Sequence, residues 1–161
     1  HMDVVKKNLL IAKNNMAPAY LQNNKFKYAI KLFSETKNSK GLDSARKNAC
    51  VFYVKKKKFY RALKFAFNQE LQKHVYSAWV EYDCQKHKYT RALKNSNRVG
   101  LQQYVLGRHY NYLSAKLPKQ LNHENIKKYR GILKKMYKVA TNLDDKKISK
   151  QIKKLLAEWI F

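Results

Sequence analysis

The segment Phe52–Ala66, FYVKKKKFYRALKFA, decides how the sequence is interpreted, because two other segments repeat its pattern. Ala19–Phe33 reads AYLQNNKFKYAIKLF, and Glu81–Leu93 reads EYDCQKHKYTRAL. Each segment has a tyrosine, then a mostly polar stretch, then a lysine with an aromatic residue, and then an alanine. The anchoring tyrosines are Tyr20, Tyr53 and Tyr82. The repeats are spaced 33 and then 29 or 30 residues apart, the second value depending on whether tyrosines or alanines are compared, and this is the spacing of a unit of two antiparallel helices.

The aromatic residue and the alanine of each unit are three positions apart, on one face of a helix. These pairs are Phe26 with Ala29, Phe59 with Ala62, and Tyr89 with Ala92. A small alanine lets a neighbouring helix approach closely, while the aromatic rings fill the space between units. Because neither helix of a pair can bury its apolar stripe alone, we expect an all-α solenoid of stacked antiparallel helix pairs, with about nine helices.

Composition limits the fold. The 161 residues are the length of one compact domain, and 45% hydrophobic residues are too many for a disordered chain. Four glycines and two prolines provide few turns for an all-β fold, and no apolar stretch reaches the ~18 residues of a membrane span. We therefore expect a single domain over residues 1–161, with repeats at about 7–96 and a divergent helical part at about 98–161.

Capping residues predict where several helices begin. Asp43 or Ser44 follows a glycine and predicts the start of one helix. Asn122 predicts the start of another, and Asp144 with its neighbour predicts the start of the last. The last helix carries an apolar stripe that reaches Trp159.

The repeated pattern resembles the tetratricopeptide repeat (TPR) family over about Lys7–Leu93. Members of that family commonly have a glycine shortly before the second-helix aromatic residue, where this chain has Asn24, Lys57 and His87. The resemblance implies a right-handed superhelix whose concave wall is formed mainly by the first helix of each pair.

The resemblance also implies a binding groove on that wall. By register, the groove would carry Asn14, Lys47, Asn48, Lys73, Tyr76 and Ser77. Some members of the family hold the terminal carboxylate of a peptide with two lysines, two asparagines and an arginine. Asn48 and Lys73 match that set and the other three positions differ, so the sequence does not predict this carboxylate clamp. It favours a groove for an acidic protein segment.

The net charge of +26 arises from 36 Lys and Arg against 10 Asp and Glu, and the excess extends along the whole chain. Such a charge opposes folding by self-repulsion and attracts acidic partners over a long range. A binder of RNA, DNA or anionic polysaccharide is therefore the alternative to a protein-binding module. A membrane-surface role is less favoured, because the apolar residues of the basic C-terminal helix are expected to face the core.

Several basic residues are candidates for polyanion binding: Lys55, Lys56, Lys57, Lys58, Arg108, Lys127, Lys134 and Lys138. The run of four lysines is either a solvated turn or a phosphate or carboxylate contact. The lysines of residues 127–138 lie near one helical face, as a polyanion ladder or as an exposed side. Tyr110 lies near Arg108, and aromatic residues among basic ones can stack unpaired bases. Both interpretations of each cluster stay open at this point.

No glycine-rich phosphate loop, HExxH or GxSxG motif is present, and the histidines lack metal-ligand spacing. We therefore expect no enzyme activity, cofactor or metal site. Cys50 and Cys84 are too few for a disulfide framework and are expected to be small buried side chains. They favour a reducing compartment such as the cytoplasm.

Overall fold

A computed structural model describes residues 2–119, 121 and 123–158. Over these residues the chain forms nine helices and no strand, which confirms the all-α prediction. The chain divides into two compact units, His1–Ala78 and Trp79–Phe161, called here the N-terminal and C-terminal units. The division falls within helix α5 (Gln69–Gln85).

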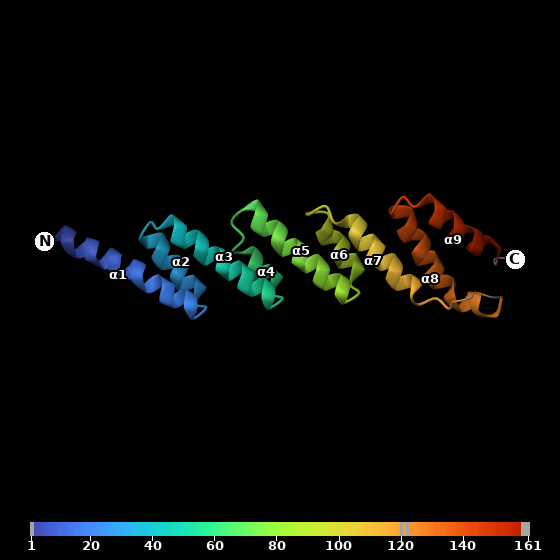
Figure 1. The fold of residues 1–161 in the computed structure, drawn as a ribbon, viewed down its shortest axis with the longest axis horizontal. Helices are drawn as coiled ribbons and strands as arrows, with labels where there is room; N and C mark the ends of the chain where they lie inside the picture. Colours follow the sequence, from blue (N-terminus) through green and yellow to red (C-terminus); the bar gives the residue numbers. More distant parts are fainter. Residues whose placement is uncertain (1, 120, 122, 159–161) are drawn as a thin grey trace. The chain divides into compact units, whose positions relative to one another are not determined.

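The N-terminal unit is built from successive antiparallel helices joined by short turns (Figure 1). They are α1 (Met2–Gln22), α2 (Phe26–Glu35), α3 (Ser39–Lys55), α4 (Phe59–Leu63) and the first part of α5. Helix α2 packs against both α1 and α3, and α3 packs against α4. The buried centre of α1–α3 consists of Ala17, Ala29, Phe33 and Ala45. Three of these four are alanines, so the helix backbones can approach closely.

Aromatic rings join the first helix pair of this unit to the second. The ring centroids of Phe26 and Phe52 are 5.3 Å apart, and those of Phe26 and Tyr53 are 6.2 Å apart. Tyr53 in turn stacks on Phe65, with centroids 5.5 Å apart and an interplanar angle of 9°. Offset and tilted pairs of this kind add to the stability that burial alone provides.

The C-terminal unit contains the rest of α5 and four further helices. These are α6 (Tyr89–Ser96), α7 (Gln102–Ser114), α8 (His123–Asn142) and α9 (Lys146–Glu158). Each packs against the next along the chain. One buried cluster joins α5, α6 and α7 through Val80, Cys84, Tyr89, Ala92 and Val105. A second joins α7, α8 and α9 and includes Leu113, Leu133, Met136 and Ile152.

The turns between paired helices share one backbone geometry. Asn24, Lys57 and His87 have φ values of 56°, 57° and 56°, the left-handed region that glycine favours. The next residue's N–H then donates to a carbonyl five residues earlier, which satisfies the last turn of the preceding helix. The glycine that these positions lack in sequence is therefore replaced by other residues in the same conformation. The three repeat alanines, Ala29, Ala62 and Ala92, are all fully buried.

This turn geometry shifts the register of the third unit by one residue. Lys25 and Lys58 donate their N–H groups to the carbonyls of Tyr20 and Tyr53, but the equivalent Lys88 donates to that of Asp83. Asp83, not Tyr82, therefore occupies the anchoring position, and the second spacing is 30 residues. The fully buried carboxylate of Asp83 accepts a hydrogen bond from Nε of Arg91 at 2.7 Å and a second from its Nη2.

One predicted helix start is wrong and another is confirmed. Helix α3 begins at Ser39, because Oδ1 of Asn38 caps it by accepting the N–H of Gly41 at 2.9 Å; Asp43 and Ser44 lie inside the helix. The last helix begins as predicted, with Oδ1 of Asp145 accepting the N–H of Ile148 at 2.9 Å. Asn122 and Trp159 lie outside the described residues.

Candidate binding surfaces

All six predicted groove residues belong to the N-terminal unit. Lys47 and Asn48 on α3 and Lys73 on α5 are exposed, whereas Asn14, Tyr76 and Ser77 are half-buried. With Asp83 as the anchor, Ser77 and not Tyr76 is equivalent to Lys47. Lys73 precedes Ser77 by four residues and so lies on the same helical face. The face that carries Lys47 on α3 thus corresponds to the face that carries Lys73 and Ser77 on α5.

Asn14 is engaged in the fold. Its Oδ1 accepts a hydrogen bond from Nδ2 of Asn38 at 2.7 Å, and Asn38 is the residue that caps α3. The two side chains therefore link α1 to the start of α3. A ligand of Asn14 would have to compete with this bond.

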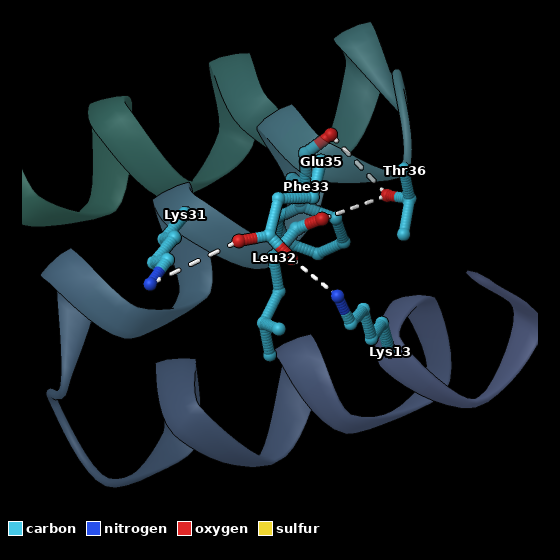
Figure 2. Close-up of polar contacts among 6 residues, drawn as sticks. All are labelled: Lys13, Lys31, Leu32, Phe33, Glu35 and Thr36. Carbon is cyan, nitrogen blue, oxygen red and sulfur yellow. Dashed lines mark hydrogen bonds and ion pairs between the residues drawn. The ribbon is translucent and has the colours of Figure 1, made fainter. Parts of the chain in front are cut away.

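The carboxylate of Glu35 lies between two lysines and connects α1 to α2, beside the hydrogen bond between Asn14 and Asn38. Nζ of Lys13 lies 2.7 Å from one oxygen of Glu35, and Nζ of Lys31 lies 3.9 Å from the other. Figure 2 shows both ammonium groups directed at the carboxylate. The hydrogen bond from Lys13, supported by the charges of both lysines, lowers the pKa of Glu35 below 4.5. An open cleft of about 380 Å³ adjoins this corner and is lined by Leu10, Ile11, Asn14, Thr36 and Asn38.

Lys47 and Lys73 are not paired in this way, although Asp43 and Glu70 precede them by one helical turn. Neither forms an ion pair with any residue that the structure describes. Residues 1–78 contain 17 Lys and Arg against 4 Asp and Glu, so acidic residues are too few to neutralise most of the bases. The surface of this unit therefore presents a positive field to solvent.

The run Lys55–Lys58 forms the turn between α3 and α4, and all four side chains are exposed. Nζ of Lys56 lies 6.0 Å from the centroid of the Phe52 ring, at the outer limit of a cation–π contact. Tyr60, two residues after the run, is 74% exposed. The turn thus combines clustered positive charge with an accessible aromatic ring.

Two of the predicted polyanion residues are engaged within the C-terminal unit. Nη2 of Arg108 lies 3.9 Å from Glu81, and its guanidinium lies 5.8 Å from the ring centroid of Tyr104. Tyr104 donates a hydrogen bond to Glu81, which lowers the pKa of that carboxyl group. Tyr110 is half-buried and packs on the α7–α9 core, and burial raises the pKa of its hydroxyl. Tyr110 therefore contributes to the core of this unit, whereas Arg108 remains exposed and its long ion pair with Glu81 leaves it accessible to a ligand.

The lysines of α8 are open to solvent. Lys127, Lys134 and Lys138 are exposed, while Leu133 and Met136 of the same helix are buried. The helix is thus amphipathic, with a basic outer face. None of these three lysines forms an ion pair with the described residues.

The C-terminal unit also holds a cluster of two histidines and two tyrosines that the sequence did not predict as a group. His87 stacks on Tyr112 with centroids 4.1 Å apart, and His109 stacks on Tyr89 with centroids 4.3 Å apart. The two tyrosine rings are themselves 5.5 Å apart. Nζ of Lys116 lies 4.2 Å from the Tyr112 centroid. The cluster joins α6 and its preceding turn to α7.

Cys50 and Cys84 are both buried free thiols, and burial raises the pKa of each. Among the described side chains, no group of three or more His, Cys, Asp or Glu residues could hold a metal ion. Over the same residues, no helix has the length and apolar character needed to cross a membrane.

Comparison with known proteins gives no relative for this chain. No family model matches it, and neither the curated proteins nor the solved structures contain a significant match.

Proposed function

We propose that this chain is a non-catalytic, TPR-like binding module whose antiparallel helix pairs stack as a solenoid and hold an acidic protein segment. The three fully buried alanines at equivalent positions, Ala29, Ala62 and Ala92, support a repeat architecture. Two buried free thiols are consistent with the reducing conditions of the cytoplasm.

The observation that carries this proposal is the pair of exposed lysines without ion-pair partners, Lys47 and Lys73, on the first helices of two successive pairs. Their ammonium groups, with the nearby amide of Asn48 and hydroxyl of Ser77, provide donors suited to carboxylate oxygens. The remaining positive charge would raise the rate of encounter with an acidic segment.

The test compares two variants of equal charge with a fluorescein-labelled oligoglutamate peptide as the probe. Lys47→Glu with Lys73→Glu reverses the charge of the two lysines in the proposed groove. Lys27→Glu with Lys64→Glu reverses two exposed lysines outside the first helices. We expect the groove variant to weaken binding about tenfold more than the control. Equal weakening would show that net charge alone governs binding and that the groove assignment is wrong.

A polyanion-binding function is the alternative, and the exposed run Lys55–Lys58 beside the exposed Tyr60 ring supports it. The basic outer face of α8, formed by Lys127, Lys134 and Lys138, supports it as well. Binding of oligouridylate or heparin would then weaken steeply with salt, with a log–log slope of about −0.7 to −0.9 per phosphate contacted for nucleic acid. If no complex with oligouridylate forms even at low salt, single-stranded RNA is excluded as the ligand.

A further inference from the structure

Helix α1 carries an apolar stripe that the described part of the chain leaves uncovered. The stripe consists of Met2, Val5, Leu9, Ala12 and Met16, at alternating spacings of three and four residues. Such spacing places them on one helical face. All five are exposed, and the four larger side chains are between 51% and 76% exposed. The contact of α1 with α2 uses a neighbouring face, through Ala17 and Leu21, and Tyr20, one turn after Met16, borders both faces.

The equivalent stripe on α3 shows what this face does elsewhere in the unit. A shift of 33 residues, the spacing between Asn24 and Lys57, relates Leu9 to Leu42, Ala12 to Ala45, and Ala19 to Phe52. In α3 these side chains cover α2. Ala45 is buried with Ala29 and Phe33, Leu42 packs on the same cluster, and Phe52 contacts Phe26. The face therefore receives an amphipathic helix that carries aromatic residues and an alanine.

We infer that the apolar stripe of α1 is a docking face for an amphipathic helix of another protein, with bulky apolar residues toward α1 and acidic residues beside them. The apolar requirement follows from α2, whose Phe26, Ala29 and Phe33 fill the equivalent face of α3. The acidic requirement follows from the charge of the N-terminal unit and from Lys6, which is exposed next to the stripe. Lys13 on the same edge already binds a glutamate of α2 across a helix–helix contact.

Charge also argues against a second copy as the occupant. Each copy carries a net charge of +26, and its last helix, α9, has five lysines among its 13 residues. Docking such a helix on α1 would bring like charges together, which opposes association. This face is distinct from the groove proposed above, so the two proposals can fail independently.

The test uses a peptide designed from α2. A synthetic peptide of residues 25–36 with Lys25, Lys27 and Lys31 replaced by glutamate keeps the apolar face of α2 and reverses its charge. We expect the full chain to bind this peptide, measured by fluorescence anisotropy. The unaltered basic peptide should bind at least about tenfold more weakly. A peptide whose two phenylalanines are replaced by serine should not bind measurably.

Two variants of the protein locate the binding face. Leu9→Gln with Met16→Gln removes two side chains of the stripe and should weaken binding of the acidic peptide about tenfold or more. Val4→Gln with Ile11→Gln changes two equally exposed apolar residues elsewhere on α1. This variant should bind the acidic peptide with an affinity within about twofold of the wild type. All four side chains are exposed, so circular dichroism should show unchanged helicity for both variants.

Three outcomes would overturn the inference. The acidic peptide could fail to bind the wild-type chain, or the two variants could lose binding equally. Alternatively, sedimentation equilibrium could show a dimer of the wild-type chain that Leu9→Gln with Met16→Gln abolishes, in which case a second copy covers the stripe. Loss of oligoglutamate binding in the groove variant, with peptide binding to α1 retained, would separate this face from the groove.

Discussion

The ring of Phe33 lies 2.5 Å from the point at which a Cβ atom on Gly41 would stand. Gly41 is in the first turn of α3, and Phe33 is a buried residue of α2. The absence of a side chain at Gly41 therefore lets α3 begin against the ring that fills the centre of the α1–α3 core. The sequence placed the start of this helix just after Gly41, at Asp43 or Ser44, although the glycine lies within the helix.

We expect Gly41→Ala to lower the free energy of unfolding by about 1–3 kcal/mol, because the Phe33 ring is fixed by packing and cannot yield without cost. Gly131→Ala is the control: it lies within α8, and a Cβ there meets nothing within 4 Å. The free energy of unfolding of that variant should rise by about 0.5–1 kcal/mol, because alanine has a higher helix propensity than glycine. Urea denaturation followed by circular dichroism measures both. Equal stability of the two variants would contradict the packing argument.

Lys57→Gly should raise the free energy of unfolding by about 1 kcal/mol, because a lysine in the left-handed region is strained and a glycine is not. Lys56→Gly, one residue earlier, should lower it, since Lys56 has an ordinary φ of −80°. Asn24→Gly should gain less than Lys57→Gly, because asparagine tolerates this conformation better. Thermal denaturation measures the stability of these variants. If Lys57→Gly has a lower thermal midpoint than Lys56→Gly, the argument from backbone strain is wrong.

Arg91→Ala should cost about 1–3 kcal/mol of unfolding free energy, because it leaves the fully buried carboxylate of Asp83 without its partly exposed charged partner. Lys94→Ala, an exposed position on the same helix, should change it by less than about 0.5 kcal/mol. Replacing Asp83 and Arg91 together by leucine should recover part of the loss. A cost for Arg91→Ala no larger than for Lys94→Ala would show that the pair adds nothing.

His109 should make the protein less stable in mild acid. Burial, with a smaller contribution from the charge of Lys135, lowers the pKa of His109 below 6.5. As the pH falls through 6.5, the unfolded chain takes up the proton first, so stability is complete above this pH and decreases until the folded pKa is passed.

His109→Phe keeps a ring against Tyr89 and should remove this contribution to the loss of stability between about pH 7.5 and pH 5.5. His74→Gln, at an exposed position of α5, should retain the wild-type dependence. Urea midpoints at the two pH values measure the difference. The assignment to His109 is wrong if both variants lose stability in acid as the wild type does.

The sequence predicted the parts of the fold that depend on local pattern. The aromatic residue and alanine of each unit are three residues apart, so their shared face and the burial of Ala29, Ala62 and Ala92 could be predicted. The register of the third unit could not, because Tyr82 and Asp83 are adjacent and backbone hydrogen bonding decides which one ends the helix. A one-residue error rotates a helical position by about 100°, which is why Ser77 replaces Tyr76 as the equivalent of Lys47.

The candidate surfaces depended more on tertiary contacts. Arg108 and Tyr110 suggested an open basic and aromatic surface, but Glu81 and the α7–α9 core engage them from other helices. The His–Tyr cluster unites His87 and Tyr89 with residues about twenty positions later, a distance at which no spacing rule applies. The apolar stripe of α1 has the spacing of a core face, so its exposure could be found only from the arrangement of its neighbours.

The two native cysteines provide one chemical reporter in each half of the molecule. Cys50 belongs to the N-terminal unit and Cys84 to the C-terminal unit, and burial shields both from reagents while the surrounding helices stay closed. The rate at which a maleimide modifies each thiol therefore measures how often that half opens. Mass spectrometry of the labelled peptides can time the opening of the two halves separately, in a single experiment on the unaltered protein.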